Sequence, residues 1–148
     1  MEPDVKDNEK GIKESGLIIS FPWGMPGLEY SEYILSPLAQ DSPFYFLQSV
    51  AQPEVGLLLM NPFTAFEDYE FDLNEDVAGQ LKINDEKQVA VLCTVNTSRG
   101  IESVSINLLA PIVINTEHLL GRQVVLNDPK YSLRAPLILK KSAEKGEC

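Results

Sequence analysis

The stretch from Phe66 to Asp76, FEDYEFDLNED, holds six carboxylates in eleven residues and contains no Lys or Arg. Carboxylates at this density can bind a metal ion, supply acid/base catalysis, begin a helix or attract a basic partner. Each of these uses requires its own spacing and its own companion residues. The sequence around the stretch can therefore be tested against all four.

The spacing does not fit a metal site. An EF-hand loop that starts at Asp72 would place Val77 at the required glycine and Ile83 at the bidentate glutamate. The chain has one histidine, His118, and two cysteines that lack a zinc-type spacing, so we expect neither a metal nor a cofactor. Cys93 lies in the apolar run VAVLCTV and is expected to be buried, whereas Cys148 is expected to be an exposed thiol.

The sequence lacks the motifs that would accompany catalytic carboxylates. There is no nucleophile elbow, no phosphate-binding glycine loop and no zinc signature. A hydrolase would need tertiary contacts to bring Glu70 close to a second carboxylate, which stays open as a remote alternative. The sequence therefore favours a protein that is not an enzyme.

A period of two runs through the first part of the stretch. Tyr69, Phe71 and Leu73 alternate with three acids, which predicts a strand at 68–73 with an aromatic side in the core and an acidic side outside. Acids two residues apart would lie roughly 7 Å from each other and repel by only about 0.6 kcal/mol in water. The acidic side is either a solvated surface or a docking surface for a basic partner, and its candidate residues are Glu67, Asp68, Glu70 and Asp72.

The charge of the whole chain argues against some partners. The net charge is −10, and eleven acids but no basic residue lie between Lys13 and Lys82. Direct binding to nucleic acid needs clustered Lys and Arg, so it is not expected. No apolar run is long enough to span a bilayer, and the first residues do not form a secretory signal. We expect a cytoplasmic protein that does not bind membranes and is a monomer when free.

Short apolar segments separated by Gly, Pro, Asn and Asp predict an all-β fold, a single barrel-like or sandwich domain with about nine to ten strands and one short helix. A polar tail is expected at 1–13, the β domain at 14–139 and a charged tail at 140–148. The expected strands span 16–21, 29–35, 44–49, 56–60, 68–73, 88–95, 102–109, 111–115 and 122–126, with a tenth if 135–140 also pairs.

Local signals place the helix and the turns. Asn74 is a suitable N-cap for a helix from Glu75 to about Leu81, and Glu75 and Asp76 would lie in its favourable first turn. Gly24, Gly27 and the SRG sequence before Ile101 indicate tight turns. Two of the six acids of the opening stretch are thus explained by helix formation alone.

Five stretches, in order, resemble the FliW flagellar assembly factor family: FPWGMPGLE from Phe21, DSPFYFLQSV from Asp41, NPFTAFEDYEFDL from Asn61, NLLAPIVIN from Asn107 and GRQVVLNDPKYSLRAPL from Gly121. Together they cover most of 21–137. The chain departs from the family pattern before Leu17, at Leu28, where an aromatic residue is usual, and at Ala135, where a histidine is common.

The resemblance implies a cytoplasmic, non-enzymatic protein that binds CsrA, a small basic RNA-binding repressor of flagellin translation. It also implies that flagellin binds in turn, so that partner exchange couples flagellin synthesis to secretion. The alternative within the family is a chaperone that acts mainly on flagellin. An acidic surface fits the first role, because it would attract the repressor and repel the phosphate backbone of its messenger RNA.

Overall fold

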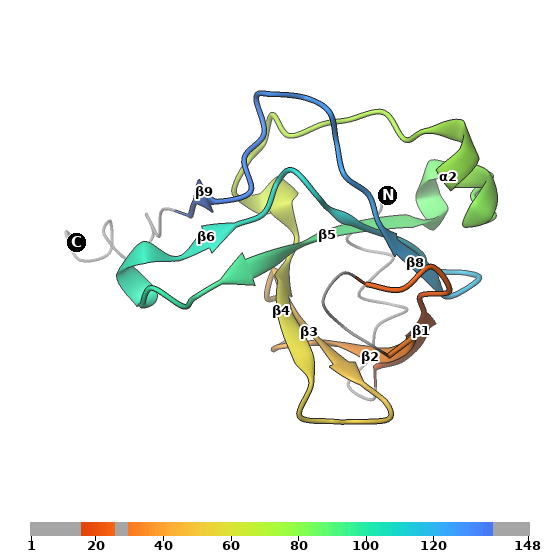
Figure 1. Ribbon diagram of the computed structural model, residues 1–148, viewed down its shortest axis with the longest axis horizontal. Coiled ribbons are helices and arrows are strands. Elements are labelled where there is room, and N and C mark those ends of the chain that lie inside the picture. Colours follow the sequence, from red (N-terminus) through yellow and green to blue (C-terminus); the bar gives the residue numbers. More distant parts are fainter. Residues whose placement is uncertain (1–15, 26–29, 138–148) are drawn as a thin grey trace.

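The computed structural model describes residues 16–25 and 30–137, and in them nine strands form one continuous arrangement (Figure 1). The strands are β1 (Leu17–Ser20), β2 (Glu32–Pro37), β3 (Phe44–Ser49), β4 (Gly56–Met60), β5 (Val89–Asn96), β6 (Ser105–Ile106), β7 (Ile112–Asn115), β8 (Leu120–Gln123) and β9 (Ala135–Pro136). The helix α2 spans Glu75–Gln80, and 3₁₀ turns occupy Pro62–Thr64 (η1), Glu86–Gln88 (η2) and Ile101–Ser103 (η3). No helix in 16–25 or 30–137 is long and apolar enough to cross a membrane.

Seven of these strands close into a barrel in the order β4-β3-β2-β1-β8-β7-β5, with β5 paired back to β4. The neighbours are antiparallel except β1 and β8, which run parallel and meet at Ser20 and Leu120. The β4–β5 junction consists of two register pairs, Leu59 with Thr94 and Met60 with Cys93. Closure pairs the strand edges with one another, which removes sites of uncontrolled sheet extension. The all-β prediction is confirmed.

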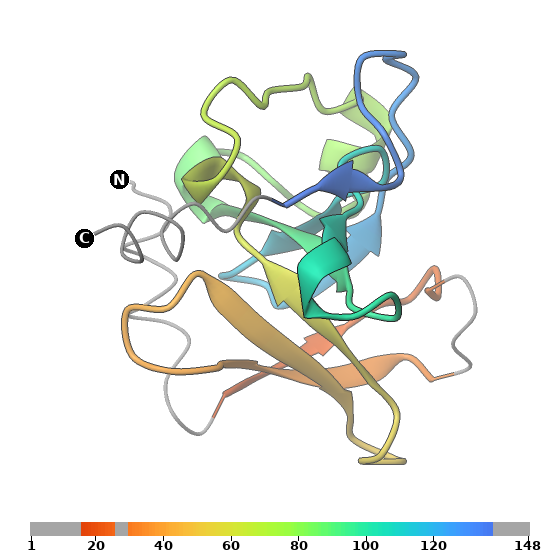
Figure 2. The same cartoon turned by 90° about the vertical axis from the view of Figure 1, so that its left-hand side faces the viewer.

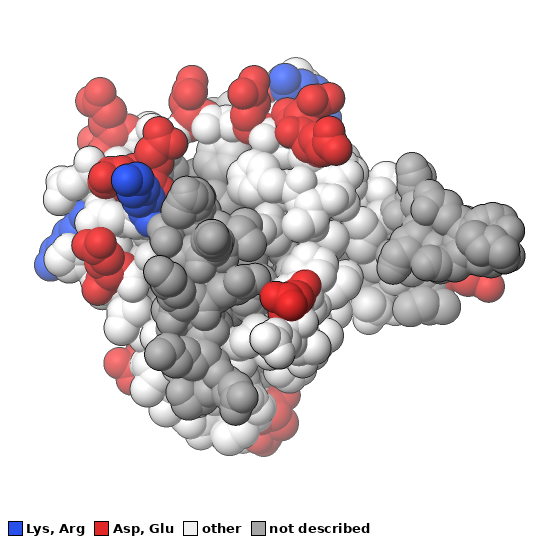
Figure 3. All heavy atoms as spheres, turned by 180° about the vertical axis from the view of Figure 1, so that it is seen from behind, with Lys and Arg blue, Asp and Glu red and all other residues white. Residues whose placement is uncertain are grey.

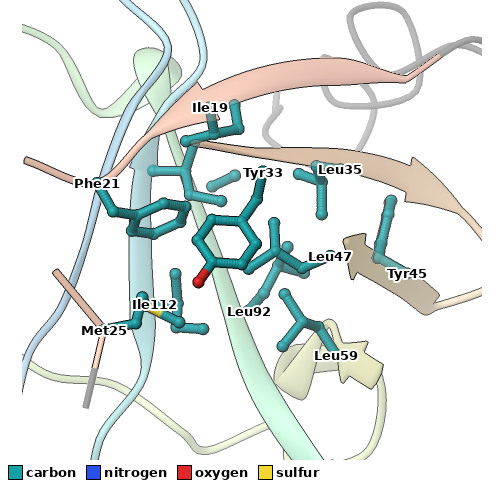
Figure 4. Close-up of a cluster of buried hydrophobic side chains, with 12 residues drawn as sticks. Ile19, Phe21, Met25, Tyr33, Leu35, Tyr45, Leu47, Leu59, Leu92 and Ile112 are labelled. Carbon is teal, nitrogen blue, oxygen red and sulfur yellow. The ribbon is translucent and has the colours of Figure 1, made fainter. Parts of the chain in front are cut away.

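The barrel interior is filled by the alternate side chains of each strand that point inward. Leu35, Leu47, Leu59, Leu92 and Ile112 are fully buried there. Figure 4 shows the Phe21 and Tyr33 rings at the centre of this group, edge to face with centroids 5.6 Å apart, an arrangement that aromatic pairs prefer. The alternation of apolar side chains along the strands therefore produces a single packed interior.

Two further clusters cover part of the barrel exterior. One lies over β4 and β5, where outward-facing Met60 and Cys93 pack with Tyr69, Leu108 and Leu137. The other lies under α2, where Val77 and Leu81 contact Val113 of β7. The segments outside the barrel are thus held by apolar residues on the outer side of its wall.

Most predicted elements are present. The helix begins after Asn74, whose side chain accepts a hydrogen bond from the Asp76 amide at 2.7 Å, as expected for an N-cap. Gly24 and Gly100 have positive φ, as the predicted turns require, and His118 is exposed in a turn. Gly27 and the tails at 1–13 and 140–148 lie outside the described residues. The strand expected at 102–109 is reduced to the two-residue strand β6. Of the strand expected at 135–140, residues 135–137 contain β9, and 138–140 lie outside the described residues.

The strand predicted at 68–73 is wrong, because no strand forms there. The amide of Tyr69 donates to Phe66 O in a turn, and both main-chain groups of Glu70 bond to the Tyr131 hydroxyl. The backbone of this segment is therefore satisfied by a turn and a side chain instead of a neighbouring strand.

Cys93 is buried, as predicted, and it lies beside the Tyr69 hydroxyl. Burial raises the pKa of the Cys93 thiol to about 12. Burial, together with the neighbouring thiol, raises the pKa of the Tyr69 hydroxyl well above its ordinary value. Both groups therefore stay neutral in the folded protein at a pH where they ionise in the unfolded chain.

Two glycines give a matched test of the barrel packing. A Cβ at Gly121, on the inner side of β8, would lie 2.6 Å from Phe21 Cε2, whereas a Cβ at Gly79 in α2 would meet no atom within 4 Å. We expect Gly121→Ala to destabilise the protein by about 1–3 kcal/mol through overpacking. Gly79→Ala should stabilise it by up to about 1 kcal/mol. Urea unfolding of both variants checks this, and equal shifts of the same sign would contradict the packing.

Alkaline pH should unfold the protein through Cys93 and Tyr69. Because their folded pKa values are raised, the stability they contribute is complete below the unfolded values, near 9 and 10, and is lost as pH rises towards the folded values. The free energy of unfolding, measured in urea from pH 8 to 11, should fall with pH. In Cys93→Ala the fall should be shallower between pH 9 and 10, and identical slopes would refute the role of the thiol.

Candidate functional site

The four predicted site acids lie on one segment that crosses the outside of the barrel between η1 and α2. Glu67, Asp68, Glu70 and Asp72 are all exposed. The segment runs along the upper edge of the molecule in both Figure 1 and Figure 2. The structure therefore brings the predicted residues together on one surface, although not on a strand.

The segment starts from a rigid turn. Buried Asn61 caps η1 by accepting a hydrogen bond from the Phe63 amide at 3.0 Å, and Pro62 occupies the first position of the turn. The Phe66 amide then donates to Pro62 O at 2.8 Å. These bonds set the direction in which the chain leaves β4.

Tyr69 anchors the middle of the segment. Its buried hydroxyl donates to Leu108 O at 2.7 Å, and its ring packs against Phe63, Phe71 and Tyr131 with centroids 5.8, 5.6 and 4.8 Å away. A buried aromatic ring with a satisfied hydroxyl fixes a loop more firmly than an exposed contact does. The side chains on either side of Tyr69 are consequently directed outward.

Tyr131 holds the next residue by its main chain. Its hydroxyl accepts a hydrogen bond from the Glu70 amide at 3.0 Å and donates one to Glu70 O at 2.8 Å. These two bonds fix the main chain of Glu70. Its carboxylate is exposed and can face solvent or a partner. Sequence reasoning missed Tyr131, which lies 61 residues away and carries no periodic signal; its place in the family-like stretch NDPKYSL was the available pointer.

The alternation that was read from the sequence survives without the strand. Tyr69 is buried, Phe71 and Leu73 are half-buried, and Asp68, Glu70 and Asp72 are exposed. Tyr69, Phe71 and Leu73 pack against the clusters on the barrel exterior, which leaves the acids between them in solvent. The prediction of sidedness was therefore right, although the prediction of pairing was wrong.

The acids continue into α2. Glu75 and Asp76 occupy its exposed first turn, and with Glu67, Asp68, Glu70 and Asp72 they form what we call the acidic rim. Figure 3 shows acidic side chains in a row along the upper edge of the molecule.

Lys130 lies close to the acidic rim, across a hollow from Glu70 and Asp72. Lys130 is 4.0 Å from Asp128 and 5.4 Å from the centre of the Tyr131 ring. A shallow hollow lies between the segment that carries the acidic rim and the segment 126–130. Glu70, Phe71 and Asp72 line one side of it, and residues 126–130 line the other. The lining of the hollow combines the carboxylates of Glu70, Asp72 and Asp128 with apolar side chains such as Phe71, which suits the end of a Lys or Arg side chain.

The chemistry available here is electrostatic attraction. In the described part of the chain, no three His, Cys, Asp or Glu residues lie close enough together to hold a metal ion. Exposed carboxylates accept charge-assisted hydrogen bonds from Lys and Arg, and several on one rim raise the local concentration of a cationic partner.

Asn107 and Asn115 flank the buried stretch NLLAPIVIN and serve the fold. Asn107 Oδ1 accepts from the Leu109 and Ala110 amides, both at 3.0 Å. Asn115 is fully buried; it donates to Leu81 O at 2.8 Å and accepts from the Glu117 amide at 2.8 Å. Both side chains therefore hold turns at the two ends of this stretch.

Comparison with known proteins gives a consistent result. The sequence matches the family model described as FliW protein over residues 6–138. Proteins named flagellar assembly factor FliW are 38% identical over 130 residues in Bacillus subtilis (strain 168), covering 87% of this chain and 90% of the relative. In Clostridium novyi (strain NT) the identity is 39% over 121 residues, covering 81% and 85%.

A solved structure agrees with these relatives. It is described as the crystal structure of the flagellar assembly factor FliW, and it superposes on this fold with a TM-score of 0.75 at 38% identity, covering 86% of this chain and 89% of that one. The resemblance that was read from five short stretches is thereby confirmed over most of the chain. This chain belongs to the FliW family of flagellar assembly factors.

Proposed function

We propose that this protein acts in flagellar assembly by binding CsrA through the acidic rim and thereby freeing flagellin messenger RNA from repression. The observation that carries the proposal is the anchoring of Glu67, Asp68, Glu70 and Asp72, whose segment is fixed by Tyr69 and Tyr131 while the carboxylates face outward. The membership of the chain in the FliW family supports the same role.

The electrostatics favour a basic protein as the partner. A Lys or Arg about 4 Å from an exposed carboxylate gains about 1 kcal/mol in water, and the gain falls with added salt. Several such pairs give fast association and fix orientation more than they add affinity. The same carboxylates would repel RNA phosphates, so occupation of CsrA by this protein disfavours messenger RNA on the same repressor molecule.

Flagellin is the second proposed partner. In this scheme flagellin occupies the protein when it accumulates, and CsrA is then released to repress further synthesis. The protein works as a binding partner in the cytoplasm, where repressor and messenger RNA meet, without a catalytic step, a cofactor or direct contact with nucleic acid. It is a monomer between partners.

Charge reversal on the acidic rim tests the proposal. Glu70→Lys with Asp72→Lys should weaken CsrA binding at least tenfold at low salt, because two attractive contacts become repulsive. Isothermal titration at two salt concentrations measures the loss. The thermal transition should move little, since both side chains are exposed.

The matched control is Glu32→Lys with Glu54→Lys, which changes the net charge equally at two exposed acids outside the rim. It should leave CsrA affinity within about threefold of the wild type. Equal loss of CsrA affinity in both variants would show that only the net charge matters. No loss in either variant would show that the acidic rim is not part of the interface. A protein that binds flagellin tightly but never CsrA would indicate the chaperone alternative.

Tyr131→Phe tests the positioning of Glu70. The phenyl ring keeps the packing against Tyr69, but both hydrogen bonds to the Glu70 main chain are lost. We expect exchange of the Glu70 amide with D₂O to accelerate at least tenfold and CsrA affinity to fall by about three- to tenfold. Leu133→Ser, an exposed change two residues away, is the control. Unchanged exchange in Tyr131→Phe would show that the clamp does not hold the segment.

A further inference from the structure

The outer surface of β1–β4 differs from the rest of the barrel wall. On β5 and β7 the outward-facing Cys93 and Val113 are fully buried beneath other segments of the chain. On β1 and β3 the outward-facing Ile18 and Phe46 are 51% and 43% exposed. The described chain therefore covers the apolar exterior on one side of the barrel and leaves it open on the other.

The strand register connects Ile18 and Phe46 through Ile34 of β2, which lies between them. Ile18 lies opposite Ile34 across β1 and β2, and Phe46 lies opposite Leu58 across β3 and β4. Ile34 and Phe46 are diagonal neighbours on β2 and β3, since Ile34 is opposite Gln48. We call these four residues the apolar face; Ile18 and Phe46 are exposed, and Ile34 and Leu58 are half-buried. Contiguous accessible apolar surface of this kind marks interaction sites.

In the described residues of β1–β4 and the turns between them, every charged side chain is acidic. Glu32 and Glu54 lie at one end of the strands, and Asp41 lies in the turn at the other end; all three are exposed. The sequence has no Lys or Arg between Lys13 and Lys82. An occupant must therefore be apolar in the middle and cationic at its ends. Anionic lipid headgroups would be repelled by the same carboxylates.

The shape of the apolar face suits a helix. Four strands about 4.8 Å apart make a surface roughly 14 Å wide, and an α-helix is about 10 Å in diameter. A helix that packs across an open sheet completes the layer that the sheet lacks. We propose that the apolar face binds an amphipathic helix of a partner protein, with its apolar stripe on Ile18, Ile34, Phe46 and Leu58 and Lys or Arg near Glu32, Glu54 and Asp41.

This surface is separate from the acidic rim. In Figures 1 and 2 the strands β1–β3 lie at the bottom of the molecule, while the segment 66–74 lies at the top. A helix on the apolar face would therefore leave the acidic rim accessible. The inference goes beyond the proposed function and does not depend on it.

Designed peptides test the binding. The probe is a helical peptide of about 18 residues with Leu at i, i+3, i+4 and i+7 and Lys on both flanks. The comparison peptides are the same helix with Glu on the flanks and a scrambled sequence of equal composition. The Lys-flanked helix should bind at least tenfold more tightly than either, as measured by fluorescence anisotropy, and its affinity should fall with salt.

Paired variants locate the site. Ile18→Ser with Phe46→Ser should lower the affinity for the Lys-flanked peptide at least tenfold while the thermal transition is retained, because both side chains are already exposed. Val125→Ser with Leu133→Ser removes two apolar residues elsewhere that are more exposed than the test pair, and it should change the affinity less than threefold. Equal effects of the two pairs, or equal binding of the scrambled peptide, would overturn the proposal.

Two other occupants give distinct results. A wild-type dimer in sedimentation velocity that is lost in Ile18→Ser with Phe46→Ser would assign the apolar face to a second copy of this chain. Co-sedimentation with vesicles containing phosphatidylglycerol that is lost in the same variant would assign it to a membrane. Either result overturns the helix proposal, and neither affects CsrA binding at the acidic rim.

Discussion

The two register pairs between β4 and β5 are the constraint on which the rest of the structure depends. They close the barrel, and they also orient the residues of two cores, since Leu59 faces the interior while Met60 and Cys93 face the outer cluster. That outer cluster holds Tyr69, and Tyr69 holds the segment that carries the acidic rim. A strand can serve two cores in this way because its side chains alternate. The position of the acidic rim is therefore a consequence of barrel closure.

The sequence predicts those features that depend on residues close together in the chain, and it does not predict those that depend on distant residues. Alternation is local, so the strands, the sidedness of 68–73 and the burial of Cys93 were all predictable. The N-cap at Asn74 is equally local and was found. The hydrogen-bond partner of a main-chain group is determined by the tertiary structure. The Tyr131 hydroxyl bonds to Glu70, 61 residues away in the sequence, and no pattern within 68–73 distinguishes that arrangement from a strand. For the same reason the site residue that positions the others escaped notice, whereas the acids themselves did not.

The barrel exterior explains why an acidic and an apolar surface coexist. Outward-facing apolar residues occur around the wall, and α2 and the segments that pack over β4 and β5 cover one side. The acids of these covering segments face solvent because their apolar neighbours are used against the barrel. On β1–β4 nothing in the described chain performs this covering, so Ile18 and Phe46 remain exposed. Both surfaces thus result from the same alternation of side chains along the strands. The acidic rim lies on segments that cover the barrel, and the apolar face lies where no described segment covers it.

Strand β4 connects the two surfaces. Leu58 belongs to the apolar face, Leu59 to the interior and Met60 to the cluster beneath the acidic rim. Direct overlap cannot explain competition between partners that occupy surfaces on opposite sides of the molecule. Coupling would have to pass through a change in this strand or in its short junction with β5, and by linkage it would act equally in both directions. If the junction stays rigid, the proposed helix on the apolar face and the proposed CsrA contact on the acidic rim would be compatible with each other. Under the two proposals, the strength of the two register pairs between β4 and β5 would decide whether the protein exchanges its partners or holds both.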